Sequence, residues 1–471
     1  MLEKHYVCKT LFYTDMFVDR INEQKRIIEA LGKDKPVLLA VYGRRRCGKS
    51  TLLKKILSGG DIYFAADLRK KSLQMEALAG RIENTIRGFS SVKYPDWDVL
   101  FQNLGNSLNH RITLCIDEFP YLVKNSPELP SLIQNIIDND INRNYNLILC
   151  GSSQQMMEGM VLNSASPLYG RCDEILNIKP MSAAWFREYF QTGAVESVEG
   201  YGIFGGVPRY WELLSDHDSI DDCVKYHLLD TDGILYREPE MLFYDEMRTS
   251  VMVFSILTLV GVGCNRLSEI ATRLEKPATQ LNRPVKLLMD LGYIRRETPY
   301  NISPRSTKKS LYKISDPFMN FYFTFVVPNK SRLEYGLKDE VWHEISKKLD
   351  NYNSGIWEEL CRSAVPGLKP GGMTFNPAAR WWGTGLNKKP MEIDIVTEST
   401  DKSTLFIAEA KWTDKADTVK IFNDLQSKSR NLPFAGNHDI LHALFLKSIP
   451  EKIPQDAIIF TADDAVQAQP E

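Results

Sequence analysis

Residues 43–50 read Gly-Arg-Arg-Arg-Cys-Gly-Lys-Ser, which fits without a mismatch the pattern of a glycine, any four residues and then Gly-Lys-Ser or Gly-Lys-Thr. Before this stretch, residues 36–42 form an unbroken apolar run, and after it residues 51–57 carry apolar side chains at helical spacing. The order predicts a buried strand, a glycine loop and a helix, which together make a P-loop. This feature constrains the fold most, because a buried parallel strand requires an α/β architecture with helices on both faces of the sheet.

A P-loop binds a nucleotide through its phosphates. Its backbone N–H groups surround the α- and β-phosphates, the lysine reaches the β- and γ-phosphates, and the last hydroxyl binds Mg²⁺. We therefore predict ATP and Mg²⁺ as cofactors, with Lys49 also acting in catalysis and Ser50 as a magnesium ligand. The predicted nucleotide-binding residues of the loop are Gly43, Arg44, Arg45, Arg46, Cys47, Gly48, Lys49, Ser50 and Thr51.

Residues 111–119 (RITLCIDEF) form a second apolar run, which ends in Asp117 and Glu118. A carboxylate at the carboxyl end of a strand beside the P-loop strand holds the Mg²⁺ of Mg-ATP, so we assign Asp117 to nucleotide and metal binding. We assign the next acid, Glu118, as the general base that polarises a water molecule in line with the γ-phosphate. An acidic pair after an apolar run is also an ordinary strand end that meets water, so both assignments depend on the preceding P-loop.

Residues 145–153 (YNLILCGSS) predict another buried strand, which ends in small hydroxyl residues. A side chain at this end, from Ser152, Ser153 or Gln154, is placed to hydrogen-bond the γ-phosphate or the attacking water. We take Ser153 as the catalytic candidate. A plain turn or a helix cap explains the same residues equally well.

Arg171 follows a turn at 167–170 and precedes a short predicted strand at 174–178. An arginine that reaches ATP, from the same chain or from a neighbouring one, stabilises charge on the transferring phosphoryl group, so Arg171 is a candidate catalytic residue. A surface salt bridge is the alternative role for a lone arginine.

The P-loop, the Asp117-Glu118 pair and the strand at 145–153 together resemble the AAA+-like P-loop ATPases of archaea and bacteria. Residues 17–23 (FVDRINE) look like the F-x-x-R-x-x-E box of this family, which lies near the adenine. The resemblance covers roughly residues 12–245 and implies hydrolysis of ATP.

The lid signature of the same family, Gly-Gly-Val/Ile-Pro-x-Tyr, is similar to residues 201–210 (YGIFGGVPRY). The resemblance implies that Pro208 lies near the nucleotide. It leaves two roles open for Arg209, a sensor cation or a solvent-facing residue. A Gly/Pro helix break is the other interpretation of the segment.

Residues 264–313 resemble a winged helix-turn-helix, with two amphipathic helices followed by a wing hairpin at 293–296 and 310–314. The stretch carries eleven Lys or Arg against four Asp or Glu, a net of +7, which leaves −9 for the rest of a chain whose net charge is −2. This asymmetry favours contact with double-stranded DNA. A packing or protein-interaction module is the alternative.

The second of these helices, from residue 278 to 291, would read the DNA. Pro284 is expected to kink or shorten it unless it lies near the first turn. The side chains expected to project from this helix are Thr279, Gln280, Arg283 and Lys286.

From about residue 350 a new domain begins, in which Asp394 lies in an alternating strand pattern and Glu409 and Lys411 end an apolar one. With Glu358 in a preceding helical segment, these residues resemble the PD-(D/E)xK nuclease core. The resemblance implies that Asp394 and Glu409 hold a divalent ion and that Lys411 polarises the nucleophile or the phosphate. The leading proline of the motif is absent, since Ile393 stands before Asp394, and the fold can persist without cleavage.

Length and composition bound the architecture. A chain of 471 residues with 43% hydrophobic and 25% charged residues is globular and long enough for about three domains. We expect an α/β fold: a P-loop NTPase parallel sheet with a helical lid, then a winged helix-turn-helix and a C-terminal α/β restriction-endonuclease-like domain. The predicted division is 12–180 for the ATPase core, 181–245 for the lid, 250–315 for the winged helix, 316–349 for a helical connector and 350–471 for the nuclease-like domain.

Cysteine usage and apolar runs exclude several classes. The eight cysteines include no C-x-x-C pair, so neither a zinc site nor a disulfide framework is predicted. The N-terminus lacks the pattern of a signal peptide, and the longest apolar run, 251–263, is too short to span a bilayer. We expect a cytoplasmic protein without a membrane partner.

The leading functional hypothesis is a Mg-ATP-dependent ATPase whose hydrolysis controls engagement of double-stranded DNA, with metal-dependent DNA cleavage as a second activity. An alternative is a nucleotide-switched module that binds DNA or protein, with vestigial hydrolysis and an inactive nuclease-like domain. A third is a defence or toxin-like assembly, a homo-oligomer whose state ATP sets.

Overall fold

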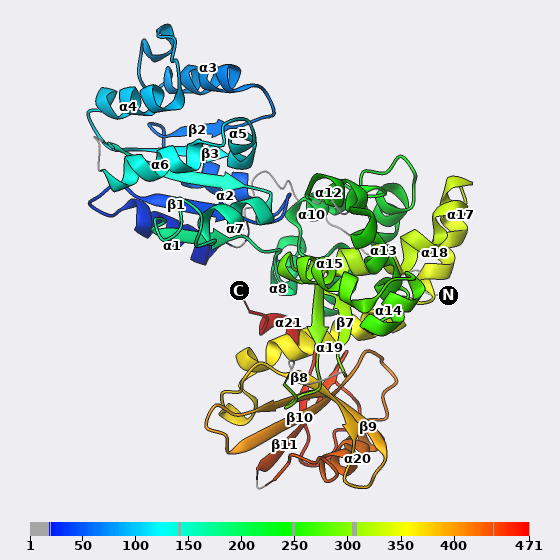
Figure 1. Cartoon of the computed structure of the whole chain (residues 1–471). Coiled ribbons are helices and arrows are strands. Elements are labelled where there is room, and N and C mark those ends of the chain that lie inside the picture. Colours follow the sequence, from blue (N-terminus) through cyan, green and yellow to red (C-terminus); the bar gives the residue numbers. More distant parts are fainter. Residues whose placement is uncertain are drawn as a thin grey trace. The chain divides into compact units, whose positions relative to one another are not determined.

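The computed structural model describes residues 18, 20–139, 143–246, 250–303, 309–436 and 438–470. The chain forms two compact units, one of residues 19–180 and the other mainly of residues 181–471 (Figure 1). Each is described by itself. Within the described ranges, no helix has the length and apolar character that crossing a membrane requires.

The described part of the first unit is built on a five-stranded sheet in the order β2-β3-β4-β1-β5, in which every neighbouring pair is parallel. The strands are β1 (Leu38–Tyr42), β2 (Ile62–Ala65), β3 (Ile112–Asp117), β4 (Tyr145–Gly151) and β5 (Glu174–Asn177). The predicted P-loop α/β sheet is confirmed. One expectation is wrong: the strand that ends in Asp117 does not lie beside the P-loop strand β1, because β4 separates them.

Helices connect these strands, as parallel pairing requires. They are α1 (Ile21–Leu31), α2 (Lys49–Ile56), α3 (Lys71–Ile82), the 3₁₀ turn η1 (Phe89–Ser91), α4 (Trp97–Ser107), α5 (Phe119–Asn125), α6 (Leu129–Asp138) and α7 (Gln154–Val161). Every residue of β1, β3 and β4 is buried, which explains why the three strands are continuous apolar runs. The carboxyl ends of these strands therefore lie on a rigid, covered sheet.

The second unit begins with helices that correspond to the predicted lid: α8 (Ala183–Phe190), α9 (Ala194–Phe204), α10 (Pro208–Ser215), α11 (Ile220–Cys223), the π-helix η2 (Val224–Leu228) and α12 (Glu238–Glu246). Next come α13 (Ser250–Gly261), α14 (Leu267–Arg273), α15 (Ala278–Asp290) and the antiparallel hairpin of β6 (Ile294–Glu297) and β7 (Leu311–Ile314). These helices and the hairpin are the elements that a winged helix requires. Pro284 lies inside α15, which continues past it to Asp290, so it does not shorten the helix.

Short helices follow the hairpin: α16 (Pro317–Phe321), the π-helix η3 (Tyr322–Val326), the 3₁₀ turn η4 (Val327–Asn329), α17 (Lys330–Glu334) and α18 (Lys338–Ser346). The Asp316 side chain caps α16 by accepting a hydrogen bond from the Met319 N–H at 2.8 Å. The aromatic run that follows is buried almost throughout, as Tyr322, Phe323 and Phe325 illustrate. Its spacing serves packing of the unit's core.

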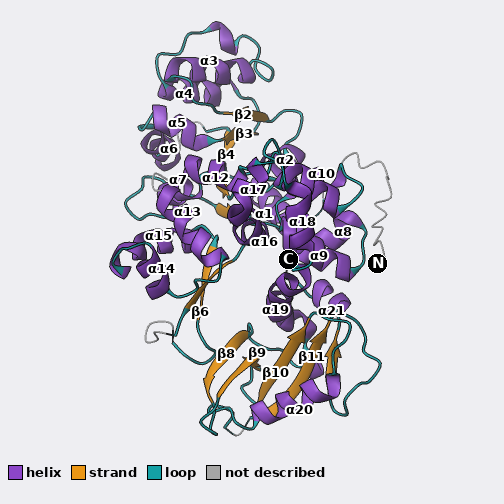
Figure 2. Ribbon diagram, turned by 90° about the vertical axis from the view of Figure 1, so that its right-hand side faces the viewer, coloured by secondary structure: helices purple, strands orange, loops and turns teal. Residues whose placement is uncertain are grey.

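The C-terminal part contains a mixed sheet in the order β12-β11-β10-β9-β8 (Figure 2). Strands β8, β9 and β10 pair antiparallel, whereas β10, β11 and β12 pair parallel. The elements are α19 (Leu349–Leu368), the 3₁₀ turn η5 (Pro370–Gly372), β8 (Ala379–Thr384), β9 (Pro390–Glu398), β10 (Thr404–Lys411), α20 (Thr418–Ser429), β11 (Asp439–Leu446), β12 (Ile458–Phe460) and α21 (Ala462–Gln467). The predicted C-terminal α/β domain is confirmed at this level, and its likeness to nucleases stays a prediction.

The lid helices and the C-terminal sheet share a hydrophobic core. Ala183 of α8 and Val198 of α9 are buried in one cluster with Trp357 of α19 and Phe406 of β10. An ion pair between Arg187 of α8 and Asp463 of α21, at 2.7 Å, lies at the edge of this contact. Helices α8 and α9 are therefore packed as part of the C-terminal body.

Candidate functional site

The predicted P-loop connects the end of β1 to the start of α2. Gly48 caps α2 with a left-handed backbone (φ 84°), and Arg46 before it is also left-handed (φ 66°). The loop thus directs its N–H groups, together with the positive end of the helix dipole, at one point. Such an arrangement binds an anion.

The first glycine of the loop is required by packing. Gly43 has φ 147°, and a Cβ built on it would lie 2.2 Å from the carbonyl oxygen of Ile178, after β5. No side chain fits there without displacing backbone. The Gly43 position in the motif is therefore explained by its close approach to the neighbouring chain segment.

The Lys49 side chain turns back onto the backbone of its own loop. It is buried, and its Nζ donates hydrogen bonds to the carbonyl oxygens of Gly43 and Arg44, both at 2.8 Å. Among the described residues, this buried ammonium is hydrogen-bonded only to neutral carbonyls, so it is a charge whose anionic partner a phosphate would supply.

Asp117, at the end of β3, accepts hydrogen bonds from two hydroxyl groups. The Ser50 Oγ lies 2.6 Å from Asp117 Oδ2, and the Tyr63 hydroxyl of β2 bonds to the same oxygen. Burial opposes ionisation of Asp117, but the bonds from Ser50 and Tyr63 outweigh it and lower its pKa. The residues fit a magnesium ion, since a hydroxyl and an ionised carboxylate meet at one place.

Glu118 has a left-handed backbone (φ 54°) and stands at the N-cap of α5. Its Oε2 accepts a hydrogen bond from the Ser152 Oγ at 2.9 Å and from the Ser152 N–H at 3.2 Å. The residue that orients Glu118 is therefore Ser152. Ser153, the catalytic candidate from the sequence, is the N-cap of α7 and makes no side-chain capping bond.

Arg45 connects the P-loop to the Glu118 side of the sheet. Its guanidinium donates to the Tyr121 hydroxyl at 2.7 Å and lies 3.4 Å from the Ser152 Oγ. Of the other predicted loop residues, Arg44 and Cys47 are buried, whereas Arg46 and Thr51 are exposed. Lys49, Ser50, Asp117, Glu118 and Ser152 thus belong to one edge of the sheet, where β1, β3 and β4 end.

The predicted F-x-x-R-x-x-E box begins at Phe17, which lies outside the described residues. Its Arg20 is buried and pairs with Glu23 at 3.1 Å. The same guanidinium donates to the carbonyl oxygens of Lys179 at 2.6 Å and Cys47 at 3.2 Å. The box therefore ties the start of α1 to the P-loop backbone.

Arg171 lies at the other edge of the sheet. The N–H of Asp173, two residues on, bonds to the carbonyl of Leu38, where β1 begins. The P-loop starts five residues later, which is about 16 Å along a strand. The Arg171 guanidinium forms a two-bond ion pair with Asp138, at 2.8 Å for each bond. The fold places Arg171 away from the P-loop of its own chain, and a role in catalysis, from the same chain or from a neighbouring one, stays a prediction.

The lid signature has a local structural cause. A Cβ on Gly206 would lie 1.9 Å from the carbonyl oxygen of Met181, whose N–H bonds to the Gly206 carbonyl at 2.7 Å. Pro208 begins α10 in its first turn, where proline is favoured. Arg209 is exposed and pairs with Glu212 at 2.6 Å. Contact of Pro208 with a nucleotide stays a prediction.

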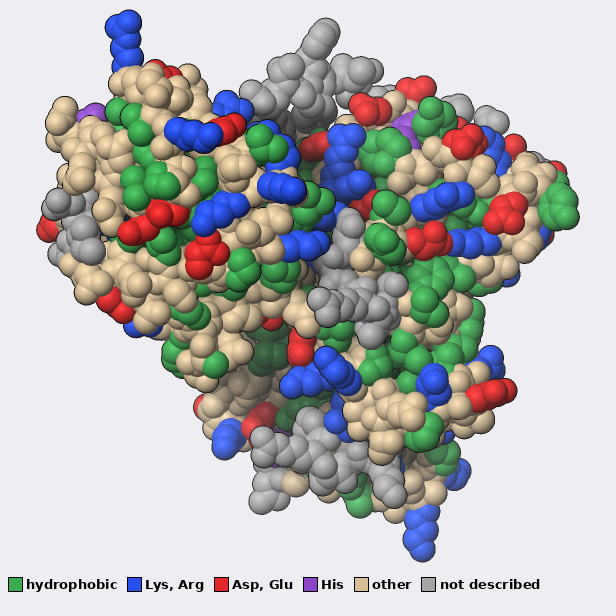
Figure 3. All heavy atoms as spheres, turned by 45° about the horizontal axis from the view of Figure 1, so that its top comes forward, with side chains coloured by type: hydrophobic (Ala, Val, Ile, Leu, Met, Phe, Trp, Pro, Cys, Tyr) green, Lys and Arg blue, Asp and Glu red, His purple; other side chains and the backbone are tan. Residues whose placement is uncertain are grey.

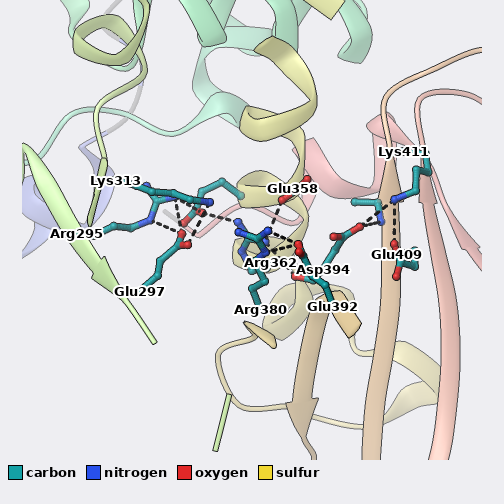
Figure 4. Close-up of polar contacts among 12 residues, drawn as sticks. Arg295, Glu297, Lys313, Glu358, Arg362, Arg380, Glu392, Asp394, Glu409 and Lys411 are labelled. Carbon is teal, nitrogen blue, oxygen red and sulfur yellow. Dashed lines mark hydrogen bonds and ion pairs between the residues drawn. The ribbon is translucent and has the colours of Figure 1, made fainter. Parts of the chain in front are cut away.

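In the C-terminal sheet, Asp394 of β9 lies beside Glu409 and Lys411 of β10 (Figure 4). Lys411 Nζ lies 3.1 Å from Asp394 Oδ2 and 2.9 Å from Glu409 Oε2. A second lysine, Lys428 of α20, is 2.5 Å from Glu409 Oε1. The sequence did not single out Lys428, because no spacing rule connects α20 to the end of β10.

The carboxyl groups of this cluster influence one another. Burial, and next the charge of Asp394, raise the pKa of Glu409 to about 7. Burial and the Asp394 charge also raise the pKa of Glu358, on α19. Burial disfavours the charged form of Asp394 too, but Lys411 and hydrogen bonds lower its pKa. Three acidic groups with hard oxygen donors are thus crowded, which is the charge arrangement that a divalent cation relieves.

A chain of ion pairs runs from this cluster to the wing hairpin. Arg362 of α19 donates to the backbone carbonyl of Asp394 at 3.0 Å and to Glu359 at 2.9 Å. Glu359 in turn accepts from Arg295 of β6 at 2.6 Å, and Arg295 also pairs with Glu297 at 3.0 Å. Figures 1 and 2 show the hairpin extending from α13–α15 towards α19 and β8.

The four side chains predicted to project from α15 are all exposed. Among the described residues, Arg283 and Lys286 make no ion pair. On the face drawn in Figure 3, Lys and Arg side chains are interspersed with Asp and Glu, so no single sign dominates that view. Recognition of DNA therefore remains a prediction about the local surface of α15.

Comparison with known proteins supports the ATPase part. Residues 17–214 match the family described as "ATPase domain predominantly from Archaea", and residues 322–421 match "Archaea bacterial proteins of unknown function". Among solved structures, the Walker-type ATPase PABY2304 of Pyrococcus abyssi is similar in fold, with a TM-score of 0.51 and 21% identity. That match covers 65% of this chain and 95% of the P. abyssi chain. The ORC2 protein of Aeropyrum pernix matches more loosely, with a TM-score of 0.38 and 14% identity over 71% of this chain and 98% of its own.

A protein of Methanocaldococcus jannaschii, MJECL04, is 33% identical over 460 residues, which is 95% of this chain and 100% of the relative. Similarity of that extent reaches well beyond the P-loop and includes both matched domains. The chain belongs to the same family as this M. jannaschii protein, and with its archaeal-type ATPase domain it is a prokaryotic P-loop ATPase.

Proposed function

We propose that the protein hydrolyses Mg-ATP at the carboxyl edge of the first sheet, with Glu118 as the general base. The observation that carries this assignment is the pair of contacts Ser50–Asp117, at 2.6 Å, and Ser152–Glu118, at 2.9 Å. The first gathers oxygen donors for the ion, and the second orients a carboxylate.

Each residue then has a defined task. The P-loop N–H groups hold the phosphates, and Lys49 exchanges the carbonyls of Gly43 and Arg44 for phosphate oxygens. Ser50 and Asp117 would hold Mg²⁺, which neutralises charge on the β- and γ-phosphates when bound. Glu118 takes a proton from water as the water oxygen bonds to the γ-phosphorus and the bond to the bridging oxygen breaks.

We further propose that nucleotide state controls the engagement of double-stranded DNA by the second unit. Support comes from the exposed basic side chains of α15, Arg283 and Lys286, and from the net charge of +7 over residues 264–313. The ion pairs from Arg295 to Glu359 and on to Arg362 connect the wing to the acidic cluster. Binding of DNA at the wing would thus be transmitted to Asp394 through Arg295, Glu359 and Arg362.

The acidic cluster itself supports metal-dependent cleavage of a phosphodiester. Asp394 and Glu409 would hold the cation, Lys411 would contact the scissile phosphate, and Glu358 would accept a proton. A bound divalent ion would stabilise the charge of the attacked phosphate. The crowding that raises the pKa of Glu409 to about 7 fits such an ion.

A nicking assay tests the cleavage proposal. Supercoiled plasmid is incubated with the full chain in Mg²⁺ and in Mn²⁺, and the Asp394→Ala and Lys411→Ala variants are compared with Asp424→Ala. Asp424 is an exposed carboxylate on α20 and serves as the charge-matched control. We expect nicking by the parent and the control, and loss in the two cluster variants. Absence of nicking by the parent in both metals would reject cleavage.

One observation favours a second candidate function, a nucleotide-switched binding module. Lys411 and Lys428 already neutralise charge in the cluster, because their Nζ atoms lie 2.5–3.1 Å from carboxylate oxygens of Asp394 and Glu409. A domain with such pairs can persist as a binding surface without cleavage. Phosphate release measured with and without duplex DNA separates the two: stimulation by DNA supports control of an active ATPase, whereas DNA binding with unchanged, near-background turnover supports the module.

A further inference from the structure

Three side chains with metal-binding atoms meet in the lid, and none of them belongs to either site described above. His217 follows α10, Cys223 ends α11, and His227 lies in the π-helix η2. One ligand atom from each lies within 4.8 Å of the others. The lack of a C-x-x-C pair predicts no zinc site, but the spacing here, His-x₅-Cys-x₃-His, needs no such pair.

The polar atoms of this cluster are poorly satisfied as they stand. The Nε2 atoms of His217 and His227 face each other at 3.0 Å, so only one proton fits between them. The His227 Nδ1 is buried and has no hydrogen-bond partner among the described residues. The Cys223 thiol reaches only a long contact, 3.8 Å, with the Leu213 carbonyl. A cation between the two Nε2 atoms and the thiol would end their competition for one proton and give the thiol a close partner. The His227 Nδ1 lies on the other side of its ring and is no evidence for that cation.

The local backbone also points to a specific purpose. A π-helix is rare and occurs most often where a side chain must be placed for function. Here it follows directly on α11, and His227 lies four residues after Cys223, a spacing that places both side chains on one side of a helix. The Tyr226 ring lies next to both imidazoles, with its centroid 5.4 Å from that of His217 and 4.9 Å from that of His227.

Charge around the cluster favours a cation. The negative charge of Asp216 contributes to the electrostatic potential at both the Cys223 thiol and His227. Asp222 adds to it at the thiol, whereas the positive charge of Arg209 reduces it at His227.

We propose that His217, Cys223 and His227 bind a zinc ion that joins the end of α10 to the π-helix. Two imidazoles and one sulfur suit Zn²⁺ better than the hard ions Mg²⁺ and Ca²⁺. Zinc–nitrogen distances of about 2.0–2.1 Å place two tetrahedral nitrogens about 3.3 Å apart, so the imidazoles need to separate by only about 0.3 Å. Asp216 or water completes the four ligands, and the thiol proton leaves on binding.

The site would stabilise the segment from Pro208 to Leu228, which begins at the proline of the lid signature. It is independent of the acidic cluster and of magnesium at the P-loop, because its ligands are soft or borderline. Its presence or absence is thus measured without reference to ATP hydrolysis.

Metal analysis of the full chain tests the site. The protein is produced in zinc-supplemented medium, purified without chelator and analysed by mass spectrometry of its metals. We expect about one zinc per chain. Removal of zinc followed by titration with Co²⁺ should give the visible bands of a tetrahedral site and a near-ultraviolet band from sulfur.

Variants identify the ligands. Cys223→Ser should lose the sulfur band, and His217→Ala, at a half-exposed position, should lose most of the zinc while the chain stays folded. Cys172→Ser and His438→Ala, which remove the same side-chain types elsewhere, should retain it. The proposal is overturned if the parent holds no zinc and gives no cobalt band, or if Cys223→Ser and His217→Ala bind zinc as the controls do.

Discussion

At the scale of single residues, the ATPase site shows which residues a local sequence motif can identify and which it cannot. The positions of Lys49, Ser50 and Asp117 at this edge of the sheet could be predicted, because each lies in a local pattern: a P-loop for the first two and an apolar run that ends in acids for the third. Tyr63, which bonds to Asp117, could not, because its place depends on the pairing of β2 with β3. The choice between Ser152 and Ser153 likewise depends on where β4 ends relative to Glu118, which no spacing rule states.

The contact of Ser152 with Glu118 leads to a sharp expectation. Ser152→Ala removes both the orienting hydroxyl and the 2.9 Å bond, so kcat for ATP should fall about tenfold with little change in KM, a loss of about 1.4 kcal/mol in transition-state stabilisation. Ser153→Ala is the matched control and should keep the parental rate. Equal rates for the two variants would show that Ser152 does not act through Glu118.

The raised pKa of Glu409 leads to a second expectation, about stability and metal binding. Glu409→Gln removes a carboxylate that Asp394 repels, and it also weakens two lysine contacts, so the free energy of unfolding should change by only about 1 kcal/mol. Binding of Mn²⁺ to the C-terminal cluster, followed by calorimetry in a Lys49→Ala background, should weaken at least about tenfold. Unchanged Mn²⁺ affinity would remove Glu409 from the metal site.

At the scale of elements, the contact between the wing hairpin and α19 is the least expected feature. The sequence predicts the hairpin, but not that its β6 strand pairs with α19 through Arg295 and Glu359. Contacts between segments 64 residues apart leave no periodic signal. The order of strands in the first sheet could not be predicted either, because the apolar runs of β3 and β4 are equally suited to a place beside β1. Pro284 does not shorten α15, which continues past it to Asp290, so the local rule for proline was not enough to place the end of the helix.

Breaking the wing contact should destabilise the second unit. Arg295→Ala leaves Glu359 and Glu297 without their shared guanidinium partner, and we expect a loss of about 1–3 kcal/mol in its unfolding free energy. Denaturant unfolding followed by tryptophan fluorescence measures it. Arg273→Ala, which removes an exposed arginine of α14, serves as control and should change stability by less than about 0.5 kcal/mol.

The surface of α15 gives a separate test of DNA engagement. If Arg283 neutralises a phosphate, Arg283→Ala should weaken binding to duplex DNA and reduce the slope of log affinity against log salt by about 1. Lys25→Ala, an exposed cation of α1 in the first unit, should leave the slope unchanged. A slope that is the same for parent and Arg283→Ala would place the DNA elsewhere.

At the scale of the whole molecule, the chain unites an ATPase core with a second body in which lid helices and the C-terminal sheet share one core. The second unit begins at residue 181, which is also where the predicted ATPase core is expected to end. The sequence could not indicate that Val198 of α9 and Trp357 of α19 pack together, since buried apolar residues look alike in any helix. The lid helices α8 and α9 and the sheet that carries the acidic cluster therefore belong to one packed body.

Steady-state phosphate release by the parent and by Glu118→Gln tests the central claim most directly. The substitution keeps the size of the side chain and its contact with Ser152, but it removes the general base. We expect Glu118→Gln to bind ATP as tightly as the parent and to lose at least about 100-fold in turnover. Turnover by Glu118→Gln within about twofold of the parent would contradict the assignment of this edge of the sheet as the hydrolytic site.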